Sequence, residues 1–423
     1  MKLGLRFVLF ALLLSPYFVY SQNSKKPKTN DSTSVVVGLN KTNDSVFRPD
    51  TLSNQEESPL DIGRNRGLFI TTPDNKMQMR ILGSVRMYVY YDTKLMSSNS
   101  TFNTYEVPVD SNAQLVPNFN FNVYKSRFGF EVTRLTDVGQ IFVRLEMDFE
   151  GPNNSLRIRH AYGQYKNFLI GQTWSLFMDV ESQPLMVNGG GPTGNIDIRT
   201  PQIRYTNTFA KKFIYDLGLE YSQPQYQSPD SVQASTINAF PSITARLSYS
   251  TKFADLQFSS ILSRLVFQYS NDNNSYLPGY GFMVAGKFYP PKHKRNTAYL
   301  MLSYVNSLSH FITTFNNAGL DAVYDPNTGL FASVSAFSGY LALSRELIKN
   351  IDATVSVGYA KIFNKDYQQE LDFRESISVS LDAFWHIYEG TRLGAEYAFG
   401  KRYDKDFSSG TASRVSVLFY YDF

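Results

Sequence analysis

The sequence predicts an all-β fold: a 16-stranded antiparallel transmembrane β-barrel with short periplasmic turns, long outer loops and an inward-folded third loop. Three observations predict it. Many segments alternate apolar and polar residues with a period of two, which gives a strand two faces in different environments. Aromatic residues make up 15% of the chain, with 29 Tyr and 33 Phe, and membrane barrels place such rings at both interfaces. The connections alternate between short and long, as membrane barrels require.

The segment from Arg414 to Phe423 shows the alternation most clearly. One face is apolar and aromatic, and it carries Val415, Val417, Phe419, Tyr421 and Phe423. The other face is mostly polar, and it carries Arg414, Ser416, Leu418, Tyr420 and Asp422. The edge strand of a soluble sandwich would show a similar pattern, but the rest of the chain favours a membrane barrel. We therefore predict that Phe423 lies where the last strand closes the barrel on the first.

The first 21 residues have the features of a secretory signal peptide. Lys2 and Arg6 provide a basic start, the run from Phe7 to Leu14 is apolar, and Val19-Tyr20-Ser21 fits a cleavage site. That apolar run is far shorter than the roughly 20 residues of a spanning helix. A secreted chain that crosses a membrane with strands is expected in the outer membrane of a Gram-negative bacterium, in contact with its lipids.

Residues 22–76 are predicted to be a flexible periplasmic segment, because they are rich in Asn, Ser, Thr, Lys and Pro and lack apolar periodicity. Residues 77–423 are predicted to form the barrel. The chain has no Cys, and none of its four His lies at the spacing of a helical metal site. We expect no metal and no cofactor. The formal net charge of +4 is mild, so no nucleic-acid partner is expected.

The barrel strands are predicted from alternation and turn residues, in chain order. Their expected extents are 79–91, 118–132, 139–150, 155–165, 167–173, 201–208, 212–222, 240–251, 253–263, 279–290, 296–306, 335–346, 349–360, 374–385, 389–400 and 411–422. The longer connections are expected at 92–117, 174–200, 223–239, 264–278, 307–334 and 361–373. This order places both ends of the barrel domain on the periplasmic side.

The third outer connection stands apart because it combines an apolar cluster with a run of glycines. Trp174 and its apolar neighbours are expected to anchor it to the barrel wall, and Gly189-Gly190-Gly191 would let the chain double back. A plain surface loop with a turn-forming glycine run is the alternative. We predict a constriction loop that carries Trp174, Asp179, Glu181, Asp197 and Arg199.

Charged residues on the polar faces of the strands should point into the lumen, because an Arg or Lys at the lipid midplane costs roughly 2–4 kcal/mol. The predicted pore-lining basic residues are Arg80, Arg86, Lys125, Arg127, Arg144, Arg157, Arg159, Arg204, Arg246 and Arg392. The acidic residues expected to face them across the opening are Glu146, Asp148, Asp179, Glu181 and Asp197. Rings of Arg and Lys favour anions, so the sequence predicts a channel for small polar, and preferably anionic, solutes.

The segment from Arg159-His160-Ala161-Tyr162 through Gly171-Gln172-Thr173-Trp174-Ser175 to Asp179 resembles the DcaP-type porins. The resemblance extends over most of residues 79–423. It implies a homotrimeric outer-membrane channel that takes up small, often anionic, organic solutes. Members of that family carry an N-terminal coiled coil, from which the Asn/Ser/Thr-rich segment here departs. The phosphate-selective porins are similar too, and no motif separates the two resemblances.

Two functions of other classes remain open from the sequence. A barrel enzyme of lipase type needs a Ser and a His near the outer leaflet with an orienting Asn or Asp. Ser155 and His160 are candidates, but their side chains have opposite parity along the strand. An adhesin would use the loops 92–117 and 307–334. Asp148 and Glu150 share a strand face and could hold Ca²⁺, but a solvated polar rim is the favoured explanation of this pair. We expect no enzymatic activity.

Overall fold

The computed structural model describes residues 36–39, 58–64, 66–98, 100–109, 116–210, 212–229, 232, 234–237, 239–269, 274–290 and 295–423. Residues 35–423 form one compact unit. The predicted signal peptide and most of the segment 22–57 lie outside the described residues. None of the short helices in the described part is long and apolar enough to cross a membrane.

The described chain consists almost wholly of antiparallel strands. Those of the first half are β1 (Val36–Leu39), β2 (Leu68–Thr71), β3 (Met77–Asp92), β4 (Asn118–Asn122), β5 (Arg127–Thr136), β6 (Gly139–Asp148), β7 (Arg157–Tyr165), β8 (Phe168–Trp174), β9 (Arg199–Phe209), β10 (Phe213–Glu220), β11 (Tyr226–Gln227) and β12 (Ala234–Ile237). Those of the second half are β13 (Ser242–Ser250), β14 (Ala254–Tyr269), β15 (Asn274–Phe288), β16 (Asn296–Asn306), β17 (Ala322–Asp325), β18 (Leu330–Ser333), β19 (Ser335–Ile348), β20 (Ile351–Phe363), β21 (Phe373–Tyr388), β22 (Thr391–Asp404) and β23 (Ser409–Asp422). Four 3-10 helices lie between strands: η1 (Thr104–Glu106), η2 (Pro152–Asn154), η3 (Ser309–Phe311) and η4 (Thr313–Phe315).

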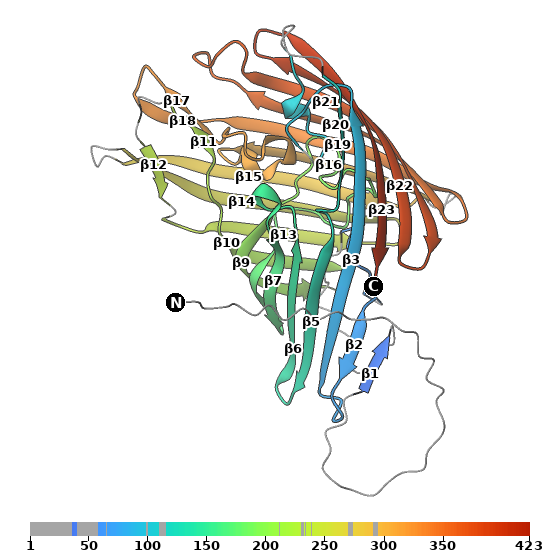
Figure 1. Cartoon of the computed structure of the whole chain (residues 1–423). Helices are drawn as coiled ribbons and strands as arrows, with labels where there is room; N and C mark the ends of the chain where they lie inside the picture. The colour runs from blue at the N-terminus through green and yellow to red at the C-terminus, as the bar shows by residue number, and fades with distance from the viewer. Residues whose placement is uncertain are drawn as a thin grey trace, which may run out of the picture. The chain divides into compact units, whose positions relative to one another are not determined.

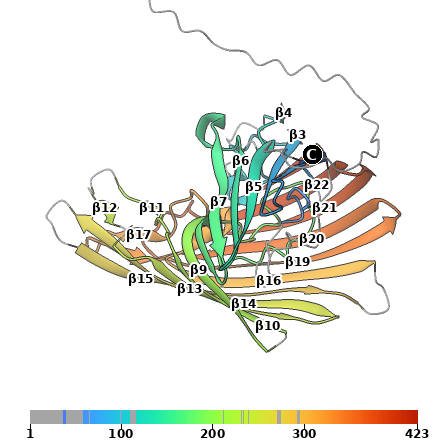
Figure 2. The same cartoon turned by 90° about the horizontal axis from the view of Figure 1, so that it is seen from below.

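Sixteen of the described strands close into a ring, each paired with its neighbour in the chain. The ring runs β3, β5–β10, β13–β16 and β19–β23, and β23 pairs with β3 from Arg414↔Asp92 to Asp422↔Ser84 (Figure 1). β4 continues the line of β5, and β12 that of β13. In the view from below, β5–β7 lie across the barrel from β14–β16 (Figure 2). The predicted fold class, including closure by the last strand, is confirmed.

The two faces of the strands have the environments that alternation predicts. On β23, Val415 and Val417 are exposed on the outer surface, whereas Arg414 and Ser416 are buried inside. Leu418, the apolar exception of the inner face, packs with Tyr88, Tyr420 and other residues in an interior cluster. The outer surface is therefore the lipid-facing one, and the inner face lines the lumen or supports loops that enter it.

One predicted connection is wrong. Residues 264–278 were expected to form an outer loop, but β14 and β15 continue through most of them and pair from Ala254↔Phe288 to Gln268↔Asn274. The alternation fails there because Leu265, Val266 and Phe267 are all buried. Leu265 and Phe267 belong to one cluster with residues of the loop that follows β16, which is a different environment from either lipid or lumen.

The end of the predicted flexible segment is ordered. β2 pairs with the lower end of β3, from Leu68↔Ile81 to Thr71↔Gln78 (Figure 1). Just before it, Leu60, Asp61 and Ile62 are buried. From residue 58 onward, the described part of the predicted segment thus holds an irregular stretch with buried side chains and then the strand β2.

The lipid-facing surface yields a first prediction. Val417→Arg should cost about 2–4 kcal/mol, because the charge would lie near the middle of the hydrocarbon layer, whereas Tyr421→Arg near the short turns should cost about 0–1 kcal/mol. The measurement is urea unfolding of both variants in lipid vesicles, read by the heat-dependent gel mobility of the folded barrel. Equal costs for the two variants would contradict the orientation of β23.

Candidate functional site

The third loop, residues 175–198 between β8 and β9, is fixed to the barrel interior at its root. Glu220, at the end of β10, is buried and accepts hydrogen bonds from Ser175 Oγ (2.6 Å) and Leu176 N (2.8 Å). It also accepts from Thr200 Oγ1 (3.0 Å) and Thr244 Oγ1 (2.9 Å). Four donors around one carboxylate compensate its burial. They hold the loop root to three neighbouring strands.

Beyond its root the loop follows the barrel wall that is formed by β14 and by β19 to β22. Gln257 Nε2 donates to Met178 O (2.9 Å) on the β14 side, and Tyr340 OH donates to Ser182 O (3.0 Å) on the β19 side. Further along, two loop amides donate to strand carboxylates. These hydrogen bonds are Val187 N to Asp382 Oδ1 (2.8 Å) and Asn188 N to Glu396 Oε2 (2.8 Å). Inward polar residues of the strands thus satisfy a loop that has no regular structure of its own.

Apolar contacts reinforce this path. Trp174, Phe177 and Met178 are buried in one cluster with side chains of β14, β15, β16 and β19. The loop turns back at Gly191 and Gly194, whose φ angles of +73° and +82° favour glycine. Close approach matters as well, because a Cβ on Gly358 of β20 would lie 2.2 Å from Thr193 O. The predicted inward fold of this loop is confirmed.

The wall opposite the loop carries a ladder of alternating charges on β6 and β7. Glu146 accepts from Arg144 Nη2 (2.6 Å) and from Arg159 Nε (2.8 Å). Asp148 accepts from Arg159 Nη1 (3.1 Å) and Arg157 Nη2 (2.6 Å). The register of the antiparallel pair, with Glu146↔His160 and Asp148↔Arg157, brings these side chains together. Each charge is stabilised by a partner at hydrogen-bonding distance.

Between this wall and the third loop lies a cavity of about 290 Å³, here called the upper pocket. Its lining comes from the wall, from the third loop at Gly189 and Gly190, and from the connections after β3 and β16. The basic residues that line it are Arg86, Lys125, Arg127, Arg157, Arg159 and Arg199, and the acidic ones are Glu106, Glu150 and Asp197. Positive charge therefore outweighs negative charge in this pocket.

Two cations of the upper pocket are placed on aromatic rings. Lys125 Nζ lies 3.9 Å from the centroid of the Tyr88 ring, and the Arg199 guanidinium carbon lies 3.4 Å from that of Trp174. Lys125 Nζ and Arg199 Nε have no hydrogen-bond partner among the described residues. Each ring attracts the charge of the cation above it, and both of these nitrogen atoms are buried.

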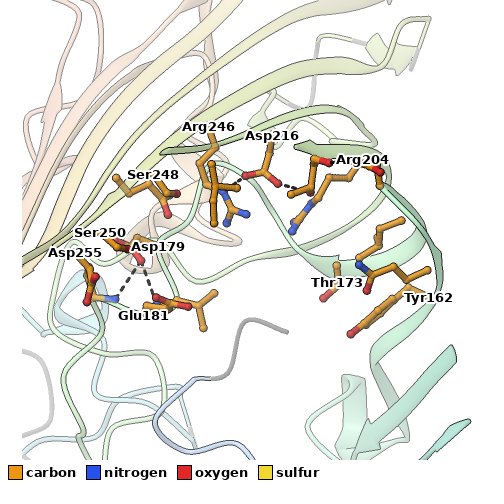
Figure 3. A pocket seen from close by; sticks show the side chains of 18 of the residues that line it. Tyr162, Thr173, Asp179, Glu181, Arg204, Asp216, Arg246, Ser248, Ser250 and Asp255 are labelled. Atoms are coloured by element: carbon orange, nitrogen blue, oxygen red, sulfur yellow. Dashed lines mark hydrogen bonds and ion pairs between the residues drawn. The ribbon is translucent and has the colours of Figure 1, made fainter. Parts of the chain in front are cut away.

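A second cavity, here called the lower pocket, opens towards the short turns. Asp216 accepts from Arg246 Nε (2.7 Å) and lies between Arg246 and Arg204 on one wall, with Asp179 and Glu181 of the third loop across from them (Figure 3). Arg204 also donates to Trp174 O (2.6 Å), at the root of the loop. The charged side chains of the loop in this pocket are carboxylates, whereas the wall carries arginines around Asp216, so a transverse field crosses the lower pocket.

The predicted pore-lining residues all lie on the inner side of the barrel, in four settings. Arg86, Lys125, Arg127, Arg157 and Arg159 line the upper pocket. Arg144, Arg204 and Arg246 line the lower pocket. Arg80 pairs with Glu131 (2.9 Å) near the short turns. Arg392 donates to Tyr420 OH (2.7 Å).

Among the predicted loop residues, Trp174, Asp197 and Arg199 line the upper pocket, and Asp179 and Glu181 line the lower one. The expectation that Glu146 and Asp148 face the arginines across the opening is wrong. Both lie on the arginine-bearing wall, because neighbouring strands pair in that register.

The other predicted sites do not form. His160 is buried and its Nδ1 lies 3.0 Å from Thr173 Oγ1, whereas Ser155 is exposed outside the lumen, so they do not make a catalytic pair. Asp148 and Glu150 are bridged by Arg157 rather than left open for Ca²⁺. Among the described residues no group of three His, Asp or Glu is placed to hold a metal ion.

Sequence reasoning missed several residues that shape the lumen. Glu220 and Asp216 follow the same alternation as the predicted arginines, so counting acidic residues on β10 would have found them. Asp61 contacts Arg127 (2.8 Å) and Arg159 (3.4 Å) from the N-terminal side of the chain. No periodic signal marks Asp61, because it lies on an irregular segment.

A closed 16-stranded barrel with an inward third loop and a charged, loop-narrowed lumen defines an outer-membrane channel of the porin class. The family model described as DcaP outer membrane protein matches residues 52–423, and the chain belongs to that family. Its place is accordingly the outer membrane of a Gram-negative bacterium. No curated protein matches the chain.

Solved structures support the same fold. The outer membrane channel DcaP of Acinetobacter baumannii superposes with a TM-score of 0.71 at 19% identity, covering 82% of this chain and 98% of that one. The anion-selective porin from Comamonas acidovorans gives a TM-score of 0.55 at 11% identity, covering 82% and 100%. OmpT of Vibrio cholerae gives 0.51 at 9% identity, covering 82% and 98%.

The close packing of the third loop yields a second prediction. Gly358→Ala should push the loop at Thr193 away from β20 and into the lumen, lowering single-channel conductance and destabilising the barrel by about 1–3 kcal/mol. Gly163→Ala is the matched control, because its Cβ would meet nothing nearer than 3.9 Å. An unchanged conductance in Gly358→Ala would show that the loop does not set the pore width.

Proposed function

We propose that this channel is a passive diffusion pore for small polar solutes with a preference for anionic organic solutes. The observation that supports it most is the charge of the upper pocket, where six basic side chains are set against three acidic ones. A confined site with an excess of one charge raises the local concentration of the opposite ion. The solute class expected from the family resemblance agrees with this excess.

Lys125 and Arg199 are the proposed contacts for the solute anion. The other cations of the upper pocket make hydrogen bonds or ion pairs with protein oxygens, which satisfy part of their charge. Lys125 Nζ has no such partner among the described residues and lies close to Gly189 of the third loop. It therefore stands on the wall beside the third loop, where both line the upper pocket.

The lower pocket would act on the same solute differently. Asp179 and Glu181 lie on the loop side, whereas Arg204 and Arg246 lie around Asp216 on the wall (Figure 3), so a dipolar solute would be turned rather than held. We also propose that the channel assembles as a homotrimer in the lipid bilayer, as the family resemblance implies. The apolar outer faces of the strands provide the surface that lipid or neighbouring subunits would cover.

The anion preference yields a third prediction. Reversal potentials of single channels in a salt gradient should indicate anion selectivity in the wild type. Lys125→Gln combined with Arg199→Gln should weaken it, because both remove an unpaired lumen charge. Lys349→Gln, on the exposed β19–β20 turn, removes the same kind of charge outside the pore and should change nothing. A cation-selective wild type would overturn the proposal.

One observation favours a second candidate function, hydrolysis of esters at the outer mouth. Ser222 Oγ lies 2.9 Å from His310 Nε2, and His310 Nδ1 lies 2.6 Å from Asp321 Oδ2. This is the order of contacts in a Ser–His–Asp triad. Asp321 is also bound by Ser309 Oγ and by two backbone amides, of His310 and Gln225. The same group therefore ties the loop after β10 to the loop after β16.

An ester hydrolysis assay separates the two functions and gives a fourth prediction. If the contact only joins the two loops, the wild type and Ser222→Ala should both release p-nitrophenol from a p-nitrophenyl ester at the rate of empty vesicles. A wild-type rate that disappears in Ser222→Ala, with single-channel conductance retained, would establish hydrolysis. Ser235→Ala, on β12, is a control for an unrelated serine.

A further inference from the structure

Residues 58–64, here called the strap, enter the lumen from beside β2. The chain ends at Phe423, directly after β23, where it forms backbone hydrogen bonds with Gly83 of β3. Beyond this point β2 pairs with β3 in place of β23. Gly67 makes the turn between strap and β2 with φ of +121°, and a Cβ there would lie 2.5 Å from Ile81 O. Only glycine fits this turn without strain. The chain therefore passes from the sheet into the barrel at this point.

Arginines of the barrel wall bind the strap through its backbone. Leu60 O accepts from Arg86 Nη2 (2.6 Å) and from Arg127 Nη1 (3.1 Å). Gly63 O accepts from Arg80 Nη2 (2.7 Å). The Leu60 side chain packs with Tyr88, Leu418 and other inner-face residues. The strap is thus seated by polar and apolar contacts together.

The one acidic side chain of the strap lies among the basic residues that line the upper pocket, here called the basic cluster. Asp61 Oδ1 lies 2.8 Å from Arg127 Nη1 and 3.4 Å from Arg159 Nη2, and Asp61 Oδ2 accepts from Ser58 N (2.8 Å). Asp61 is buried, and both arginines line the upper pocket. A carboxylate in this position makes the contacts that the carboxylate of a solute would make.

We propose that the strap is a tethered internal ligand of the basic cluster, and that Asp61 lowers the affinity of the channel for carboxylate solutes. The inference rests on the proposed anion preference. Asp61 neutralises Arg127 and Arg159, which leaves Lys125 and Arg199 as the upper-pocket cations that have no carboxylate at ion-pair distance among the described residues. Ser58 and Leu60 also form part of the upper-pocket lining, so the strap narrows the space as well as reducing its charge.

The alternative is that Asp61 has only a structural role and stabilises the barrel wall through Arg127 and Arg159. Glu146 and Asp148 already hold Arg159, whereas the contact with Asp61 is the shortest ion pair of Arg127, whose other one, with Glu146, measures 4.0 Å. Replacing Asp61 with Asn keeps the shape and one of the two acceptor oxygens and removes the charge. A purely structural role would then alter stability and leave selectivity unchanged.

The experiment compares full-length wild type, Asp61→Asn and Asp74→Asn in planar bilayers. Asp74 lies on the exposed hairpin between β2 and β3, so it matches the loss of charge outside the lumen. Citrate is added as a blocker. We expect Asp61→Asn to raise the anion-to-cation permeability ratio and to lower the half-blocking citrate concentration about fivefold, because an internal competitor has been weakened. Asp74→Asn should behave as the wild type.

The outcomes separate this inference from the proposed function. An anion-selective wild type with an unchanged Asp61→Asn overturns the strap inference alone. A cation-selective wild type overturns the anion preference on which it rests. If Asp61→Asn does not reach the folded gel mobility, Asp61→Ser serves in its place. Asp61→Glu, which keeps the charge, should restore wild-type block, and failure to do so would contradict a role for charge.

Discussion

The hydrocarbon interior of a bilayer offers no hydrogen-bond partners, so every backbone amide and carbonyl within it must be paired inside the protein. For a sheet this requires closure, and here β23 meets β3 to provide it. β3 extends below the end of β23, and β2 pairs with the part that would otherwise be bare. The position of β2 sets where Gly67 turns the chain inward. The strap is thus a consequence of how the ring is completed.

Closure creates a wide interior, and the third loop divides it. The loop is irregular, so its backbone groups need partners, and inward residues such as Glu220, Asp382 and Glu396 supply them. These contacts hold it on the far side and leave the β5–β7 wall facing open space. That wall is charged, yet most of its charges are paired with neighbours. Pairing offsets the free-energy cost of burying these arginines and carboxylates. In the proposed function, selectivity therefore depends on the few charged groups without partners.

Much of this could be predicted from the sequence, for one physical reason. Where one strand face meets lipid and the other meets water, the period of two fixes strand, orientation and the inward set of charges. Arg144, Arg204 and Arg246 were found in this way. The rule fails where the environment changes, as at Leu265 and Phe267, which pack against a loop. The rule also cannot predict which side chains on neighbouring strands are in contact. Glu146 and Arg159 are in contact because of the register in which β6 and β7 pair. Asp61 lies on a segment with no period at all.

The unequal lengths of the strands have a consequence for entry into the channel. β10 has 8 residues, whereas β14 has 16 and continues for seven residues beyond the end of its ladder with β13 at Leu262↔Ile243. At 3.4 Å per residue this adds roughly 24 Å of strand. The rim is therefore cut obliquely, high along β14 and β15 and low along β7 to β10. A solute that approaches parallel to the bilayer would meet the extended strands β14 and β15 on one side of the rim. On the side of β7 to β10 it would meet a lower edge.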